Sequence, residues 1–258
     1  MTAGAQSGRA GDLVDGAVLS RGDVQLWWAA PADFTSESLV AQGAVLPDHE
    51  RTAAARFEFE ADRKQALLTR LMVRQVLTRT RGGIAPDAWR FARTPFGRPV
   101  IANPGCDELI FSLSHTRSLV VCAVAAGAPL GVDIESLAQP APLQVARRSF
   151  APDETADILS APLDLRARRF FAYWTLREAF IKAVGLGFSL PSASFSFTLR
   201  RDTVAVELNA DLALSVGASD RWHFHLGDIN PAHLLAVACS ADAPLNLTFH
   251  AAGPLLRA

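Results

Sequence analysis

The chain has 258 residues, of which half are hydrophobic and a fifth are charged, and its formal net charge is −1. This balance is typical of a folded protein, and the length suits one large domain or two packed halves. Because acidic and basic residues are nearly equal in number, no overall field would draw the chain to nucleic acid or to an anionic membrane, and we expect neither as a partner.

Cysteine usage and the apolar runs both predict a soluble, cytoplasmic protein. The three cysteines lie far apart and show no C-x-x-C spacing, so neither a zinc site nor a disulfide framework is indicated. The longest apolar stretch, residues 119–132, contains glycine and proline and is shorter than the roughly 18 residues that cross a bilayer. Residues 1–21 are rich in Ala, Gly and Asp, which predicts a flexible tail and not a signal peptide.

The first half of the chain is predicted to contain several strands and one long helix. Apolar, aromatic or valine-rich runs favour strands at residues 24–30, 89–91, 110–113 and 119–125. The spacing of apolar side chains from about Asp48 to Thr80 predicts a helix with one apolar face, closed by Gly82. Residues 95–97 (PFG) predict a turn between two of the strands.

The second half also mixes helices and strands. A strand begins at Val132–Ile134, and the segment Gln139–Pro142 predicts a linker because its prolines fit no regular element. After it we expect a short helix through Phe150, a second that opens near Pro152, and a long one over about residues 165–184. Further strands are favoured at residues 195–199, 204–208, 222–226 and 234–239.

Two apolar segments resemble each other, LVVCAVA at residues 119–125 and LLAVACS at residues 234–240. Each would be the last core strand of its half. They favour two pseudo-symmetric halves of about 120 residues with a ligand cleft between them. Any two core strands can look alike, so the segments alone leave this duplication open.

The segment at residues 131–135 (GVDIE) carries two acids on one face of a predicted strand. Alternate side chains of a strand share a face, so Asp133 and Glu135 point the same way while the residues beside them point into a core. Two adjacent carboxylates repel each other unless a cation compensates, and hard ions such as Mg²⁺ prefer carboxylate oxygens. The alternative is an ordinary strand end with a solvated acidic face.

The predicted long helix carries Trp174, Glu178 and Lys182 at intervals of four residues, which places them in one stripe. Such a Glu–Lys pair is usually an exposed ion pair that contributes about 0.3–0.5 kcal/mol. Because this helix contains many aromatic residues, little of its surface is expected to be exposed to solvent, which favours a stripe that faces a cleft. A solvated stripe is the competing interpretation.

Residues 111–115 (FSLSH) place Ser114 and His115 on a predicted loop before the central strand. A serine and a histidine there can bind phosphate by hydrogen bond and, when the imidazole is protonated, by charge; a structural role is the alternative. The sequence contains no G-x-S-x-G elbow, no G-x-x-x-x-G-K-[ST] loop and no G-x-G-x-x-G after a strand, so the usual hydrolase and nucleotide-binding folds are unsupported.

Together these segments resemble the Sfp-type 4′-phosphopantetheinyl transferases. The hallmark motifs of that family, G-[IV]-D-[IV]-E and W-[ST]-x-[KR]-E-[AS]-x-x-K, occur here in order, as GVDIE at residues 131–135 and WTLREAFIK at residues 174–182. The similarity extends to the helix at residues 57–74, FGRP at 96–99, SLSHT at 112–116 and LPSASFSF from Leu190.

The resemblance implies an α+β fold of two similar α/β halves related by pseudo-twofold symmetry, with the active site in the cleft between them. We expect a tail at residues 1–21, an N-terminal half at 22–128 and a C-terminal half at 129–258 that carries the metal site. The family also implies a monomer, because a chain with both halves completes its own cleft.

The implied reaction transfers the 4′-phosphopantetheine group of coenzyme A, the co-substrate, to a serine of an apo acyl, aryl or peptidyl carrier protein and releases 3′,5′-ADP. Such carriers serve fatty acid, polyketide and nonribosomal peptide synthesis. Two alternatives are an Mg²⁺-dependent phosphotransferase or nucleotide hydrolase that uses no carrier, and a degenerate homologue that only binds carriers.

The resemblance also implies roles for single residues. Asp133, Glu135 and Glu178 match the family's Mg²⁺ ligands, with Mn²⁺ as an alternative ion. Glu178 would be the general base, and Lys182 would approach the pyrophosphate and offset charge on the leaving group. The positions that hold the nucleotide and its 3′-phosphate are matched by Arg98, Ser114 and His115.

The first-half helix departs from the family pattern. Members of the family often carry lysines before this helix that reach the 3′-phosphate, whereas this chain offers Arg51 and Arg56. Gln65 and Ala66 also replace an Arg-Thr pair that is common there. Nucleotide contacts from this side are therefore assigned only to the two arginines.

Overall fold

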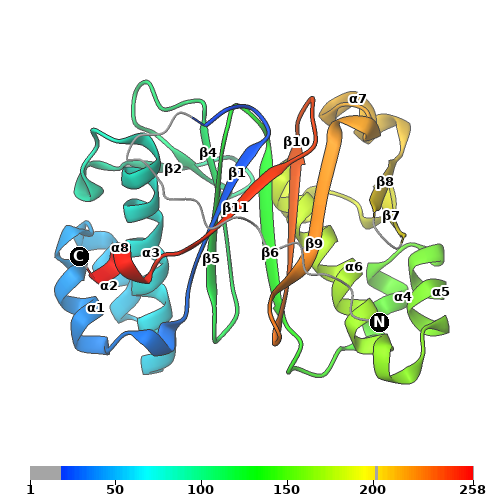
Figure 1. Cartoon of the computed structure of the whole chain (residues 1–258), viewed down its shortest axis with the longest axis horizontal. Helices are drawn as coiled ribbons and strands as arrows, with labels where there is room; N and C mark the ends of the chain where they lie inside the picture. Colours follow the sequence, from blue (N-terminus) through cyan, green and yellow to red (C-terminus); the bar gives the residue numbers. More distant parts are fainter. Residues whose placement is uncertain (1–18, 201–202, 258) are drawn as a thin grey trace.

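The computed structural model describes residues 19–200 and 203–257, so most of the predicted tail lies outside the described residues. Two larger sheets stand side by side at the centre of the molecule, with helices on the outer face of each (Figure 1). One sheet has the strand order β11-β1-β5-β4, and the other has the order β6-β10-β9. Within the described ranges, no helix has the length and apolar character needed to cross a membrane.

The N-terminal half surrounds helix α3 with short helices and strands. Its elements are β1 (Asp23–Ala29), α1 (Ser36–Gln42), α2 (Asp48–Ala55), α3 (Glu60–Arg81), β2 (Phe91–Arg93), β3 (Pro99–Ile101), β4 (Leu109–His115) and β5 (Val120–Ala126). Strand β5 lies between β1 and β4 and is antiparallel to both, while β2 and β3 form a separate hairpin.

The C-terminal half repeats this order of elements, with the helix α7 added before its last two strands. It consists of β6 (Leu130–Ser136), α4 (Ala146–Ser149), α5 (Pro152–Ser160), α6 (Leu163–Val184), β7 (Phe195–Leu199), β8 (Val204–Leu208), α7 (Ala210–Val216), β9 (Trp222–Asn230) and β10 (His233–Ser240). Strand β10 lies between β6 and β9 and is antiparallel to both, as β5 is in the other half. The two segments that resemble each other in sequence are therefore equivalent central strands, and the predicted α+β fold of two similar halves is confirmed.

The end of the chain returns to the N-terminal half. Strand β11 (Asn246–Ala251) pairs with β1 in parallel, and α8 (Gly253–Arg257) places Leu256 in the core beside α3. These residues therefore follow the C-terminal half in sequence but pack with the N-terminal half in space. The division of the chain into domains at residues 128 and 129 stays a prediction.

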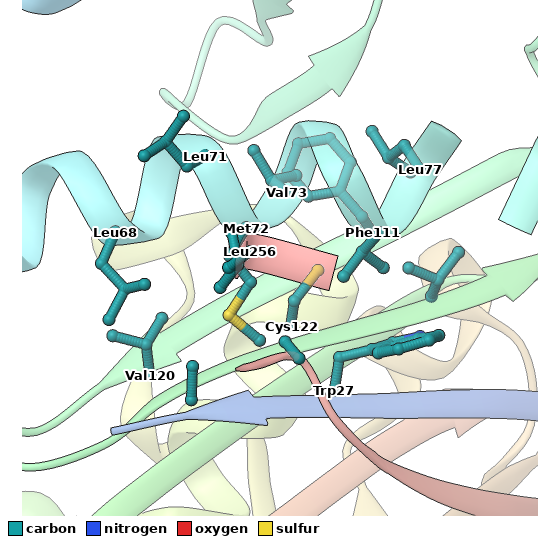
Figure 2. Close-up of a cluster of buried hydrophobic side chains, with 14 of the residues drawn as sticks. Trp27, Leu68, Leu71, Met72, Val73, Leu77, Phe111, Val120, Cys122 and Leu256 are labelled. Atoms are coloured by element: carbon teal, nitrogen blue, oxygen red, sulfur yellow. The ribbon is translucent and has the colours of Figure 1, made fainter. Parts of the chain in front are cut away.

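Three apolar clusters hold the layers together. The first lies between α3 and its sheet, where Leu68 and Met72 point toward Val120 and Cys122 of β5 (Figure 2). The second packs α6 against β10, and the third lies between the two sheets. Fully burying one such side chain contributes roughly 1.5–3 kcal/mol. The first two clusters therefore hold α3 and α6 on their sheets, and the third fixes the distance between the halves and hence the site between them.

The helix predicted from Asp48 to Thr80 is two helices, because the chain breaks between α2 and α3. Phe59 is extended at the start of α3, and the Arg63 side chain donates hydrogen bonds to the carbonyls of Phe57 (2.8 Å) and Glu58 (2.7 Å). Phe57 and Phe59 are both exposed. Apolar side chains that continue across the break without being buried explain why periodicity alone predicted one helix. Gly82 ends α3 at φ 67°, as expected.

Candidate active site

Two serines of β4 attach the acid-bearing strand β6 to the other sheet. The Oγ atoms of Ser112 and Ser114 accept hydrogen bonds from the backbone N–H groups of Val132 (3.0 Å) and Ile134 (3.3 Å). The side chains thus take the place of main-chain carbonyls where the two sheets meet. Ser114 and His115 were predicted on a loop, which is wrong: they are the last residues of β4, and Ser114 is buried.

Helix α6 crosses β6 at Gly131, and the crossing is too close for any side chain there. A Cβ atom at Gly131 would lie 1.9 Å from the carbonyl oxygen of Ala179 and 2.6 Å from the nitrogen of Ala183. The first residue of the GVDIE motif therefore lets the helix backbone lie directly on the strand. This contact brings Glu178 and Lys182 of α6 to Asp133 of β6.

Arg98, at the end of the β2–β3 turn of the N-terminal half, forms hydrogen bonds to both α6 and β6 near the point where they cross. Its guanidinium donates to the carbonyls of Ala183 (3.0 Å) near the end of α6 and of Leu130 (3.2 Å) at the start of β6. Burial lowers the pKa of this guanidinium. Two of its five N–H donors are used in this way. Arg98 therefore has a structural role in the fold. Its contact with the 3′-phosphate remains a prediction.

Asp133 is at the centre of the predicted acid cluster. Its Oδ1 accepts hydrogen bonds from Lys182 Nζ (2.7 Å) and Ser114 Oγ (2.8 Å). Lys182 Nζ also donates to the carbonyl of Val132 (3.1 Å). The other carboxylate oxygen, Oδ2, is buried and has no hydrogen-bond partner among the described residues. An unpartnered buried carboxylate oxygen is costly, which marks this atom as a ligand position.

All three acids carry pKa values raised above the ordinary carboxyl range. Burial raises the pKa of Asp133, and the charge of Lys182 only partly offsets this effect. Burial, and then the charge of Asp133, raise the pKa of Glu135 to about 7, although Trp174 donates a hydrogen bond to it. The same two causes raise the pKa of Glu178. The charge of Lys182, together with that of Arg177 at Glu178, therefore compensates the three neighbouring carboxyl groups incompletely.

These donors fit a hard divalent cation in their chemistry. They are all carboxylates, they disfavour one another's ionisation, and one oxygen has no partner. Their arrangement is that of an Asp133–Lys182 ion pair flanked by two further acids. Within residues 19–200 and 203–257, no three Asp, Glu, His or Cys side chains are grouped closely enough to form a metal cluster as they stand.

A cavity of about 550 Å³ opens beside the acids at the junction of the halves. One side is lined by His115 at the end of β4 and by Thr116, Arg117 and Ser118 of the β4–β5 turn, and the opposite side by Glu135, Ser136 and Gln139. His115 is exposed at the end of β4, yet partial burial of its ring, and then the charge of Lys182, lower its pKa. A second cavity of about 460 Å³ contains none of the predicted site residues.

The two arginines assigned to the nucleotide lie on α2 and at its end. Arg51 forms an ion pair with Asp48 and donates to the carbonyl of Leu46 (2.5 Å), and Arg56 follows the last residue of the helix. The residues that line the described cavity include neither. Gln65 instead reaches this region, because its Nε2 donates to the carbonyl of Thr116 (2.8 Å). The roles of both arginines stay predictions.

Sequence reasoning missed a buried ion pair that supports α6. Arg177 Nη1 donates to both carboxylate oxygens of Glu154 (3.1 and 2.9 Å), and Glu154 also accepts from the backbone N–H groups of Ala151 and Phe197. Neither charged side chain is more than 5% exposed. A Glu in the first turn of a helix resembles an ordinary solvated residue, and no sequence spacing connects it to Arg177.

The repeated halves, with acids and a lysine at their junction, define the 4′-phosphopantetheinyl transferase fold. Two family models match the chain in succession: "4′-phosphopantetheinyl transferase, N-terminal" over residues 29–127 and "4′-phosphopantetheinyl transferase superfamily" over residues 129–238. The chain belongs to the 4′-phosphopantetheinyl transferase superfamily, as the two sequence motifs predicted.

Relatives span most of the chain. A phosphopantetheinyl transferase of Thraustochytrium sp. is 32% identical over 230 residues, which are 83% of this chain and 76% of that protein. The 4′-phosphopantetheinyl transferase Sfp of Bacillus subtilis is 31% identical over 79% of this chain and 86% of its own. Among solved structures, the holo-[acyl-carrier-protein] synthase of Thermotoga maritima matches 45% of this chain and 64% of its own with a TM-score of 0.37 and 19% identity.

Proposed function

We propose that this protein transfers the 4′-phosphopantetheine group of coenzyme A to a serine of an apo carrier protein, in an Mg²⁺-dependent reaction, and acts as a monomer. Membership of the superfamily supports the transfer itself. The Mg²⁺ requirement is supported by the cluster of Asp133, Glu135 and Glu178. Their raised pKa values show that nearby positive charge does not fully compensate them, and Asp133 Oδ2 is buried without a hydrogen-bond partner among the described residues.

The three acids would hold the Mg²⁺ ion, and a bound ion would offset negative charge on the pyrophosphate of coenzyme A. Glu178 is half-buried, and its raised pKa suits a general base that accepts the proton of the carrier serine. The serine oxygen forms a bond to the β-phosphorus, the anhydride bond breaks, and 3′,5′-ADP leaves with the bridging oxygen.

Lys182 can act on the leaving group without giving up its structural contacts. Its ammonium has three N–H donors, and two of them bind Asp133 and the carbonyl of Val132. The side chain is 31% exposed, so the third donor can reach a phosphate oxygen. The β4–β5 turn and His115, which line the adjacent cavity, would contact the nucleotide.

The Glu178→Gln variant tests the proposed base and metal ligand. We expect at least about a 100-fold loss of transfer, because the amide cannot accept the serine proton and is a poor ligand for a hard cation. Transfer is measured by intact mass of an apo carrier protein incubated with coenzyme A and Mg²⁺. The melting temperature should stay near that of the wild type, since Glu178 is only half-buried.

Glu207→Gln is the matched control, because Glu207 is exposed on β8 and should leave transfer unchanged. Wild-type transfer that persists in chelator would refute the Mg²⁺ requirement. Release of phosphate from nucleoside triphosphates without any carrier would favour the alternative phosphotransferase or hydrolase. A wild type that binds carrier but adds no phosphopantetheine mass would be a scaffold.

Two Arg98 variants separate the structural and nucleotide roles of this residue. For Arg98→Ala we expect weaker binding of coenzyme A and a smaller difference between coenzyme A and dephospho-coenzyme A, since the charge near the 3′-phosphate is lost. Arg98→Lys keeps the charge but cannot donate to the carbonyls of Ala183 and Leu130 in the same fork. It should keep the preference for coenzyme A and lose turnover.

Steady-state kinetics with both substrates measure these effects. If Arg98→Ala lowers kcat/KM equally for coenzyme A and dephospho-coenzyme A, Arg98 does not recognise the 3′-phosphate. Its role is then limited to the hydrogen bonds to the carbonyls of Ala183 in α6 and Leu130 in β6. An Arg98→Lys variant with full turnover would instead show that this tie does not limit the reaction.

A further inference from the structure

The β9–β10 hairpin carries a histidine that reaches across to the other half of the molecule. His233 begins β10, is 5% exposed, and pairs in register with Ser136 of β6. Its Nε2 lies 2.8 Å from Ser118 Oγ and 3.2 Å from Thr116 Oγ1 in the β4–β5 turn. Its Nδ1 lies 2.9 Å from Asn230 Oδ1 at the end of β9.

The contacts of Asn230 determine which nitrogen of the imidazole carries the proton. Asn230 Oδ1 accepts a hydrogen bond from the backbone N–H of Ala232 (3.0 Å), which identifies this atom as the amide oxygen. Because an amide oxygen only accepts, His233 Nδ1 must donate to it. In the neutral ring Nε2 is then an acceptor, and the Ser118 hydroxyl donates to it. Burial lowers the pKa of His233, which favours this neutral form.

The turn that His233 contacts forms one wall of the cavity beside the acids. Thr116 and Ser118 line this cavity from the N-terminal half, while Glu135 and Ser136 line it from the C-terminal half. The turn is held internally by Thr116 Oγ1, which accepts from the backbone N–H groups of Ser118 (3.3 Å) and Leu119 (3.2 Å). His233 is the partner that attaches it to the strand next to the opposite wall.

We propose that His233 is a positioning residue for phosphopantetheine transfer, whose Nε2 holds Ser118 and so fixes the β4–β5 turn at one distance from Glu135 and Ser136. His233 does not itself line the described cavity, so it acts through the turn. The expected kinetic effect rests on the proposed function. The His233–Ser118 hydrogen bond and the tautomer of His233 do not depend on that function.

A turn that is fixed before the substrate arrives lowers the cost of binding, not the barrier of the chemical step. Loss of the His233–Ser118 hydrogen bond should therefore raise the KM for coenzyme A with kcat nearly unchanged. A change in the acids would act on kcat. This split distinguishes the positioning role from a general loss of active protein, which would lower kcat alone.

Four variants test the proposal by steady-state kinetics and by calorimetric binding of coenzyme A. His233→Leu and Ser118→Ala should each raise the KM and the Kd about tenfold and leave kcat within about twofold. The double variant should be no worse than either single one, because both remove the same bond. His233→Gln should recover most of the affinity, since its amide oxygen can accept from Ser118.

The matched control is His225→Leu, since His225 is a second histidine on this hairpin, is partly buried, and packs against Phe249 in place of the turn. It should leave the KM unchanged. Ser118→Ala removes only a hydroxyl, so it carries the test if His233→Leu does not fold. Nitrogen-15 NMR of the wild-type imidazole should show the proton on Nδ1.

The outcomes separate this inference from the proposed function. A wild type that transfers nothing to any apo carrier overturns the proposed function, while NMR and coenzyme A binding still test His233. A proton on Nε2, an unchanged KM and Kd in Ser118→Ala, additive losses in the double variant, or a loss confined to kcat would each overturn the positioning role.

Discussion

Replacement of Gly131 by alanine is expected to reduce phosphopantetheine transfer at least about 100-fold and to lower the free energy of unfolding by about 3 kcal/mol. The new methyl group would lie 1.9 Å from the Ala179 carbonyl oxygen, which belongs to the backbone of α6 and cannot rotate away. The helix must therefore move from β6 by about 1 Å or more to reach ordinary contact distance. Glu178 and Lys182 move with it, and a displacement of this size costs about 100-fold in rate.

Gly43→Ala is the matched control, because a Cβ atom there would meet only the side chain of Leu67 at 3.9 Å. We expect its stability to stay within about 0.5 kcal/mol of the wild type and its transfer to be unchanged. Denaturant unfolding and the intact-mass assay measure both variants. A Gly131→Ala protein that transfers at the wild-type rate would show that the α6–β6 crossing does not fix the catalytic geometry.

Many elements of both halves were predictable from the sequence, whereas the two similar apolar segments alone left the duplication open and the resemblance to the family implied it. The valine-rich run at residues 119–125 predicted the central strand β5, and the apolar run at residues 234–239 predicted β10. Strands β7 and β8 were predicted at their observed bounds. Gly82 and Gly185 end their helices with a positive φ, which glycine adopts without strain. These are local properties of the chain, so the sequence alone can express them.

Other elements depend on partners that are distant in sequence. Strand β11 was not predicted, because its half-buried segment is stabilised by pairing with β1, more than 200 residues earlier. Ser114 and His115 were assigned to a loop after the strand predicted at residues 110–113, whereas both belong to β4 and Ser114 binds the backbone of β6 in the other sheet. Neither contact leaves a periodic signal in the segment itself.

The site shows the same division between local and long-range information. The motifs placed Asp133 and Glu178 on a strand and a helix, and the charge of Asp133 raises the pKa of Glu178 in the fold. Sequence spacing did not reveal that Lys182 would pair with Asp133, or that Arg98 would join α6 to β6. Those contacts depend on how closely the helix approaches the strand, which Gly131 determines.

Asp133→Asn is expected to reduce transfer about 1000-fold, which corresponds to about 4 kcal/mol in the activation free energy. The amide keeps the shape of the carboxylate, and its oxygen can still accept from Ser114 and Lys182. It removes the negative charge, and it replaces the unpartnered Oδ2 with an NH₂ group that cannot bind a cation. Single-turnover transfer over a range of Mg²⁺ concentrations should show a loss that no concentration restores.

The same substitution should leave the metal-free protein as stable as the wild type or more so, because burial raises the pKa of Asp133 and the fold therefore disfavours its charge. Lys182 loses an ionic partner but is 31% exposed and can turn to water. A functional group that costs stability is typical of an active site, where charge is retained for its chemistry. Thermal unfolding in chelator tests this directly: a marked fall in melting temperature for Asp133→Asn would mean that the Asp133–Lys182 pair stabilises the fold, and the loss of transfer could then be a loss of folded protein.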